Sequence, residues 1–245
     1  MHEPNVARVV AALRPDDIVL DIGGWARPFN RATHVLDAEP YETRGWLGLP
    51  AQGGDREHFT AATWARRDIC DHAPYPFADK SVDYVICSHV LEDVRDPLWV
   101  CAEMVRIGKR GYIEVPSRIA ETCRGVEPGQ VGWSHHRWLI DIRDTRITFL
   151  LKYHTIHSHW RFSFPARFWH GLEDARRVQW LFWEERFAYE ERSIHGPDKI
   201  AEELAAFVAG VRPYPRWLAA ADRTLRGIGT FPRRLAARAR RSLRP

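Results

Sequence analysis

Acidic and glycine residues recur directly after short apolar runs in the first half of the chain. The pairs are Ile18–Leu20 with Asp21, Gly23 and Gly24; His34–Leu36 with Asp37; Thr60–Arg67 with Asp68 and Ile69; and Val82–Cys87 with Ser88 and His89. Glycine lets the backbone approach a bound group closely, and a carboxylate can accept hydrogen bonds from two neighbouring hydroxyls. This order predicts a nucleoside-binding site, with Asp37 on the ribose.

A second group of residues that could take part in catalysis lies at Trp133-Ser-His-His-Arg-Trp138. A histidine there could take a proton from a hydroxyl or amine, because its usual pKa of about 6.5 suits general-base work. We expect His136 to be that residue, with His135 as its alternative. The competing interpretation is a histidine that bonds only to loop backbone. Arg137 could pair with an acidic group of an acceptor.

Three further histidines, His154, His157 and His159, follow within a short segment. In a strand, His157 and His159 would share a face, which is compatible with a metal ion. No cysteine or acidic residue stands at a diagnostic spacing from them, so the sequence predicts a polar groove and no metal site.

The elements that must position these residues alternate between strand and helix. Strands are predicted at 18–22, 34–37, 82–87 and 111–115, and helices at 5–13 and 97–107. Such alternation favours βαβ units in a doubly wound parallel sheet, where ligands bind beyond the carboxyl ends of the strands. The second half predicts a hairpin at 138–152, a helix at 165–177, strands at 178–182 and 186–191, and a helix at 197–208.

Composition indicates a globular protein, with 45% hydrophobic and 28% charged residues. No apolar run reaches the roughly 20 residues that span a bilayer, and the start lacks the pattern of a signal peptide. Four scattered cysteines indicate buried thiols of a reducing compartment. The net charge of +4 is uneven, because residues 216–245 hold nine arginines and one aspartate. The rest of the chain is therefore acidic.

The first half resembles the class I S-adenosylmethionine-dependent methyltransferases. The resemblance rests on Val-Leu-Asp-Ile-Gly-Gly at 19–24, on Val-Leu-Asp at 35–37, and on the stretch from Asp68 to Val94, and it covers residues 16–117. That stretch is similar to the group with the pattern PF.D.SFD.V...HVLEH. The resemblance implies a Rossmann-like, seven-stranded sheet whose last strand is antiparallel. It also implies S-adenosylmethionine as cofactor and S-adenosylhomocysteine as product.

By position, the resemblance assigns each candidate residue a place along the cofactor. It puts Asp21, Gly23 and Gly24 at the methionine end, Asp37 at the ribose, Asp68 and Ile69 around the adenine, and Ser88 and His89 beneath the sulfonium. Two features depart from the pattern. Only eleven residues separate the first two strands, so we expect the 23–33 loop itself to wrap the cofactor. Asp93 stands where the pattern has a second histidine.

Pro213 and Pro215, together with the charge of the residues that follow, mark a boundary between a methyltransferase domain, residues 1–212, and a basic tail, residues 213–245. Within the domain, residues 16–117 form the cofactor half and 118–212 the acceptor half. We expect methyl transfer to an oxygen or nitrogen nucleophile of a small molecule or saccharide intermediate. A non-catalytic methyltransferase-like binding protein is the alternative. An RNA methyltransferase is a weaker one, because no Asn/Asp-Pro-Pro-Tyr motif is present and the body is acidic.

Location and partners follow from the same features. We expect a cytoplasmic protein whose tail contacts an anionic membrane or another acidic partner, or is simply solvated. Nucleic acid is an unlikely partner on these grounds. The sequence does not specify an oligomeric state.

Overall fold

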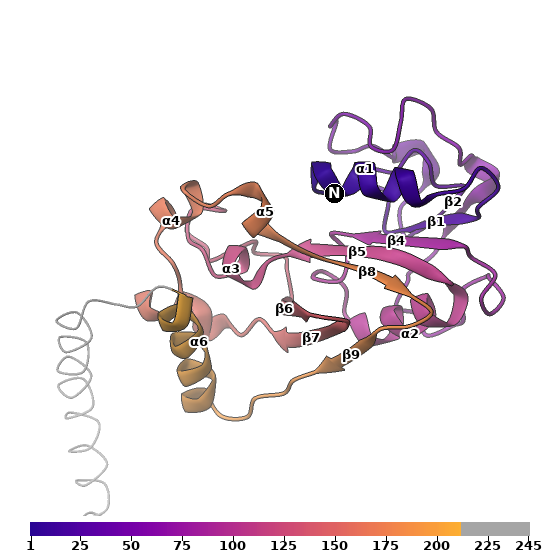
Figure 1. The fold of residues 1–245 in the computed structure, drawn as a ribbon. Coiled ribbons are helices and arrows are strands. Elements are labelled where there is room, and N and C mark those ends of the chain that lie inside the picture. The colour runs from indigo at the N-terminus through magenta and orange to yellow at the C-terminus, as the bar shows by residue number, and fades with distance from the viewer. Residues whose placement is uncertain (212–245) are drawn as a thin grey trace, which may run out of the picture.

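The main sheet of the protein has six strands in the order β3-β2-β1-β4-β5-β8 in the computed structural model, which describes residues 1–211 (Figure 1). All neighbouring strands are parallel except β5 and β8, which are antiparallel. The strands are β1 Val19–Ile22, β2 His34–Asp37, β3 Trp64–Arg66, β4 Tyr84–Ser88, β5 Arg110–Pro116 and β8 Val178–Glu184. The fold is therefore mixed α/β and Rossmann-like, as predicted.

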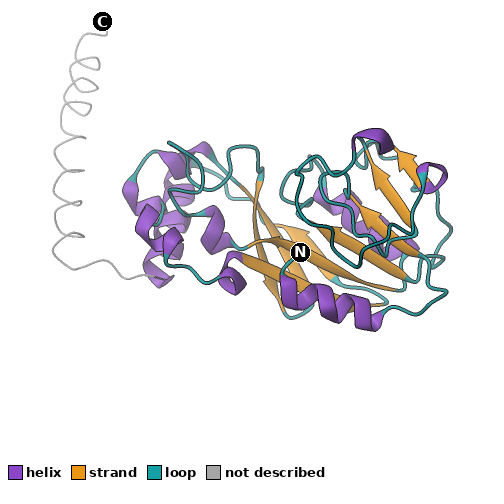
Figure 2. Ribbon diagram, turned by 90° about the horizontal axis from the view of Figure 1, so that it is seen from above, coloured by secondary structure: helices purple, strands orange, loops and turns teal. Residues whose placement is uncertain are grey.

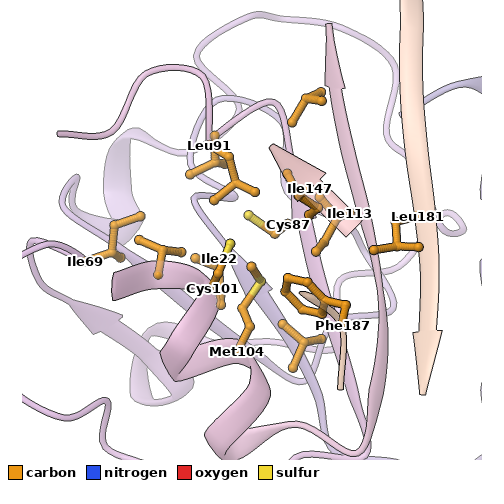
Figure 3. Close-up of a cluster of buried hydrophobic side chains, with 14 of the residues drawn as sticks. Ile22, Ile69, Cys87, Leu91, Cys101, Met104, Ile113, Ile147, Leu181 and Phe187 are labelled. Atoms are coloured by element: carbon orange, nitrogen blue, oxygen red, sulfur yellow. The ribbon is translucent and has the colours of Figure 1, made fainter. Parts of the chain in front are cut away.

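Both faces of the sheet are covered, which explains why its central strands are mostly apolar. Helix α1 (Glu3–Ala12) covers one face, where Val9 packs against Val19, Tyr84 and Tyr112. On the other face, α2 (Pro97–Ile107) packs against the alternate residues of the same strands. Figure 3 shows this second cluster around Ile22, Cys87, Cys101, Met104 and Ile113.

A second sheet, β6-β7-β9, lies on the same face as α2 (Figure 1). Its strands are β6 Trp138–Arg143, β7 Arg146–Leu151 and β9 Ala188–Glu191. The remaining helices gather at one end of the molecule (Figure 2): α3 Arg118–Glu121, α4 Ala166–His170, α5 Asp174–Arg177 and α6 Pro197–Val211. Short 3₁₀ turns occupy Tyr41–Thr43, Ala61–Thr63, His154–His157 and Trp160–Phe162.

The expected seventh strand is absent from the main sheet in residues 1–211, which has six strands. The predicted hairpin exists as β6 and β7, but both of its faces are apolar. Ile140 and Phe149 face the cluster beneath the main sheet, while Leu139 and Leu150 pack with α6. Burial of both faces holds the hairpin in its own layer, and β8 takes the antiparallel place beside β5.

Two local predictions for the second half were wrong. The helix expected over 165–177 is two short helices, because α4 ends at Gly171, whose N–H bonds to the carbonyl of Arg167. His157 and His159 do not share a strand. They lie in and just after a 3₁₀ turn, where the Nδ1 of His157 accepts from the N–H of Val131.

The predicted burial of the cysteine thiols is confirmed, since all four are buried and free. No helix within residues 1–211 is long and apolar enough to cross a membrane. The predicted boundary at 212–213 and the basic tail lie outside the described residues.

Candidate functional site

The strand order reverses direction between β1 and β4, and two neighbouring cavities lie at the carboxyl ends of these strands. We name them the Asp37 cavity, of about 680 Å³, and the Glu114 cavity, of about 690 Å³. Both volumes fall within the ~300–1,000 Å³ common for small-molecule sites, and the position is the one where open α/β sheets bind ligands. Four residues line both cavities: Gly23, Ala26, Leu47 and His89.

The loop after β1 contains no helix, and its residues 23–27 and 29 line the cavities directly. That this loop wraps the cofactor stays a prediction. Asp21 is buried, and its Oδ2 accepts the N–H of Phe29 at 2.9 Å, which ties the loop to β1. Burial raises the pKa of Asp21 to about 7, although the Phe29 N–H opposes that shift. A Cβ on Gly24 would lie 2.4 Å from the same oxygen, so only glycine fits there.

Gly23 is constrained by a different neighbour. Its φ is +72°, in the left-handed region, and a Cβ would lie 2.4 Å from Cγ2 of Val90. Gly23 thus allows the loop after β1 to approach the loop after β4 closely. Gly23 and His89, one from each loop, line both cavities.

Asp37, Asp68 and Ile69 all line the Asp37 cavity. The two oxygens of Asp37 accept the N–H groups of Trp25 and Glu39, each at 2.9 Å, which leaves each oxygen able to accept one more hydrogen bond. Burial raises the pKa of this carboxyl group. Asp68 is more firmly engaged, because its Oδ2 lies 2.6 Å from Arg95 and its Oδ1 accepts the N–H of Cys70 at 2.8 Å. Those two contacts, with the Cys70 N–H first, lower the pKa of Asp68.

Ser88 and His89 lie at the end of β4. The Oγ of Ser88 is buried and has no hydrogen-bond partner, and it lines the Glu114 cavity. His89 has a left-handed backbone with φ of +58°, and its ring lies between two buried carboxylates. Its Nε2 is 3.1 Å from Oε1 of Glu114, and its Nδ1 is 3.4 Å from Oε1 of Glu92.

The predicted acceptor histidines form one corner of the Asp37 cavity, which we call the histidine corner: Asp93, His135 and His136. The Nδ1 of His136 is hydrogen-bonded to a buried oxygen of Glu121. The other oxygen of Glu121 bonds to Nζ of Lys152 at 2.7 Å. Trp133 stacks on the ring of His136, with centroids 5.0 Å apart. His136 is therefore held in orientation and is not simply bonded to loop backbone.

The structure brings the predicted cofactor residues and the predicted acceptor histidines together around the two cavities. Lining the Asp37 cavity are Gly23, Asp37, Asp68, Ile69, His89, His135 and His136, and lining the Glu114 cavity are Asp21, Gly23, Gly24, Ser88 and His89. The groove histidines, His154, His157 and His159, line neither. His157 has a pKa lowered by burial, which agrees with its acceptor role toward Val131.

Sequence reasoning missed four charged residues of the site: Glu92, Glu114, Glu121 and Lys152. Glu92 and Glu114 are each 1% exposed, and neither oxygen of Glu92 has a hydrogen-bond partner. Glu114 could have been noticed, because it is the one charged residue in the apolar run 111–115. Glu121 and Lys152 meet only through the fold, so no local pattern marks them.

The residues of the Asp37 cavity fit S-adenosylmethionine by their chemistry. Asp37 offers free acceptor positions to ribose hydroxyls, and Ile69 offers an apolar surface to an adenine. These residues would hold the nucleoside. Gly23 and Gly24 line the adjoining Glu114 cavity. Asp21 with the Gly23-Gly24 loop would hold the methionine end, and Ser88 and His89 would lie beneath the sulfonium.

Residues 52–113 match the family model described as a methyltransferase domain, about a quarter of the chain. A search of the curated proteins finds no match. Three solved structures are similar in part, and the chain spans about half the length of the first two. The first is a Haloferax volcanii methyltransferase in complex with the Trm112 methyltransferase activator, with 22% identity, 46% of this chain and 51% of that chain covered, and a TM-score of 0.32. The second is the YcgJ protein of Bacillus subtilis, with 18% identity, 47% of this chain and 52% of that chain covered, and a TM-score of 0.33. The third is an S-adenosylmethionine-dependent methyltransferase of Mesorhizobium loti, with 18% identity, 59% of this chain and 62% of that chain covered, and a TM-score of 0.33.

Because the TM-scores of these structures are low, the fold class is identified from the strand order of the main sheet. The order 3-2-1-4-5 with a glycine loop after the first strand is that of the doubly wound nucleotide-binding sheets. The family match extends from the loop before β3 to β5, and so includes Asp68, Ile69, Ser88 and His89. Residues 52–113 therefore match a methyltransferase domain, and the sheet that contains them has the strand order of the class I, S-adenosylmethionine-dependent methyltransferases.

Proposed function

We propose that the protein transfers a methyl group from S-adenosylmethionine to an oxygen or nitrogen nucleophile of a small molecule or saccharide intermediate. The observation that carries the proposal is the Asp37 cavity, which has nucleoside-type residues at one end and the histidine corner at the other. Bound S-adenosylmethionine supplies an electrophilic methyl group. The residues of this chain supply alignment, exclusion of water and control of charge.

Alignment is the largest contribution expected of the protein, because in-line displacement gains most from correct positioning of its two partners. The Gly23-Gly24 loop is rigidly tied through Asp21 to Phe29, and Asp37 is fixed by two backbone N–H groups. Both walls are therefore set before a ligand binds. A preorganised wall lowers the entropy that binding must overcome.

Aromatic rings line the Asp37 cavity both beside Asp37 and at the histidine corner. Trp133 stacks on His136 within the histidine corner, while Trp25 and Trp46 stack on each other at the cavity wall with centroids 5.5 Å apart. Trp46 is 69% exposed and so presents a free ring face at the mouth. Exposed aromatic faces suit sugar rings and other flat small molecules, which favours a small acceptor over a polymer.

The experiment is a transfer assay with radiolabelled S-adenosylmethionine and a panel of hydroxylated, amino and glycosylated acceptors. Calorimetry with S-adenosylhomocysteine accompanies it. We expect binding of the product and label transfer to at least one acceptor class. Product binding without transfer to any acceptor would support the non-catalytic alternative, and absence of product binding would contradict the proposal altogether.

Two predictions from sequence stay predictions. They are the cytoplasmic location and the contact of the 213–245 tail with an anionic membrane or another acidic partner. A direct test is binding of the full chain, and of a chain ending at Tyr214, to anionic vesicles at low and high salt. If the tail is responsible, only the full chain binds, and salt weakens that binding steeply.

A further inference from the structure

Asp93, His135 and His136 each direct one ligand-type atom toward a common point of the Asp37 cavity. The Nε2 of His136 lies 3.7 Å from Oδ1 of Asp93, and the Nε2 of His135 lies 3.9 Å from the same oxygen. One ligand atom from each residue lies within 4.8 Å of the others. In a tetrahedral site with bonds of about 2.0–2.2 Å, ligand atoms are roughly 3.3–3.5 Å apart, so small side-chain rotations close the remaining gap.

The second nitrogen of His136 is held as metal-binding histidines are held. Its Nδ1 is bonded to the Glu121 carboxylate, and Glu121 is fixed in turn by Lys152. A carboxylate behind a ligating histidine sets the tautomer and leaves the other nitrogen free for the ion. The ring is only 7% exposed and is stacked by Trp133, so Nε2 has little freedom to turn away from the cavity.

His135 and Asp93 complete the arrangement. The Nδ1 of His135 lies 3.7 Å from a Glu127 oxygen, so this histidine too has a carboxylate on the side away from Asp93. The Oδ1 of Asp93 is buried and has no hydrogen-bond partner. Neither histidine nitrogen is near enough to donate to it, since the two distances exceed hydrogen-bond range. A buried acceptor without a donor is unfavourable, and a cation between the three residues would remove that cost.

We propose that Asp93, His135 and His136 bind a divalent first-row transition-metal ion, with Zn²⁺ as the reference ion. Two imidazoles and one carboxylate are donors that such ions accept. Three protein ligands leave at least one coordination position open, as in catalytic rather than structural zinc sites. That position faces the Asp37 cavity, so it would take an oxygen ligand such as a water or an acceptor hydroxyl.

The inference about the metal stands on the side-chain geometry alone, whereas the acceptor ligand rests on the proposed methyl transfer. It also changes the expected role of the histidine pair. A general base needs one free imidazole, but a metal site needs both imidazoles and Asp93 together. The departure at Asp93 from the family pattern then has a reason, because a carboxylate is the third ligand.

The test is metal binding by the full chain after treatment with a chelator, without cofactor or acceptor. We expect calorimetry to show one saturable Zn²⁺ per chain, and Co²⁺ to give the visible absorption of a bound ion. Asp93→Asn is isosteric and His135→Ala removes a ring that is 61% exposed, so both variants should fold. Each should bind Zn²⁺ at least about tenfold more weakly than the wild type. The matched control is His195→Ala, at an exposed histidine remote in sequence from the site.

Three results would overturn the proposal. The wild type binds no stoichiometric Zn²⁺, the two variants bind as the wild type does, or His157→Ala abolishes binding while the corner variants do not. Calorimetry with S-adenosylhomocysteine on the same preparations separates this proposal from the proposed function. Product binding without metal binding rejects the metal site alone, and metal binding without product binding rejects the methyltransferase proposal alone.

Discussion

The ring of His89 bridges to Glu114, with its Nε2 3.1 Å from Oε1 of the carboxylate. Burial acts to lower the pKa of His89, but Glu114 and Glu92 raise it to about 9. Burial likewise acts to raise the pKa of Glu114, but the His89 contact, the amino terminus and the Tyr112 hydroxyl lower it to about 2. The switch point of the sheet therefore carries a histidinium at neutral pH, shared by both cavities.

This pair predicts a specific pH dependence. The folded pKa of His89 is above the unfolded value of about 6.5, so the stabilisation is fully present below that pH and is lost as pH rises through about 9. The stability advantage of the wild type over His89→Asn should shrink between pH 7 and 10. Asparagine keeps the left-handed backbone accessible. The measurement is urea unfolding across this range.

Histidine NMR gives the second test of the same pair. The resonance that disappears in His89→Asn should titrate near pH 9 in the wild type and at lower pH in Glu114→Gln. Glu185→Gln, at a glutamate that is 77% exposed, is the control and should leave it unchanged. A His89 resonance that titrates near 6.5 in the wild type would show that the two carboxylates do not hold the proton.

The close contact of Gly23 with Val90 predicts that Gly23→Ala loses more folding stability than its backbone conformation alone would cost. Gly23→Ala must fit a Cβ 2.4 Å from Val90, whereas Gly48→Ala has a similar φ, +61° against +72°, and no atom within 4 Å. Both variants lose the conformational freedom of glycine at positive φ, but only in Gly23→Ala does the new Cβ clash with Val90. We expect Gly23→Ala to be less stable than Gly48→Ala by about 1–3 kcal/mol, the usual cost of overpacking. Equal unfolding free energies would refute the contact.

The buried ion pair of Lys152 and Glu121 predicts that removal of one partner destabilises the protein far more than removal of both. Both side chains are under 5% exposed, so Lys152→Met leaves the buried Glu121 carboxylate without its ammonium partner, although His136 still bonds to it. We expect a loss of roughly 3–5 kcal/mol in chelator-containing buffer. The double variant Lys152→Met with Glu121→Leu should recover a large part of it. Arg146→Met, which breaks a half-exposed pair with Glu190, is the control and should cost at most about 1 kcal/mol.

The cofactor half of the fold could be predicted because its signals are local. The apolar runs before Asp21 and Asp37 mark buried parallel strands, and the helix at Pro97–Ile107 begins and ends where its spacing indicates. The acceptor half was harder, because the β6–β7 hairpin is apolar on both faces and such a pattern does not say which layer it joins. Gly171 likewise ends α4 as its C-cap and divides a continuous helical pattern. Helix propensities alone do not predict that end.

The site shows the same division. Residues at strand ends, such as Asp37 and His89, were predicted because parallel strands bring their carboxyl ends to one edge. His136 was found from its neighbours in sequence, but Glu121 and Lys152 were not, since they reach it from α3 and from the end of β7. Asp93 was noted only as a departure from a pattern. Its meaning depends on the distance to two histidine nitrogens, which no spacing in the sequence encodes.

The most direct test of the account is the affinity of the full chain for S-adenosylhomocysteine, measured by calorimetry for the wild type and Asp37→Asn. Asparagine keeps one oxygen for the loop but loses the charge and the acceptor positions that a ribose needs. Charged hydrogen bonds of this kind are worth roughly 1.5–3 kcal/mol, so affinity should fall about tenfold or more. Asp55→Asn, at an exposed aspartate, should bind as the wild type does. Failure of the wild type to bind, or equal affinities for the wild type and Asp37→Asn with an unchanged thermal midpoint, would contradict the account.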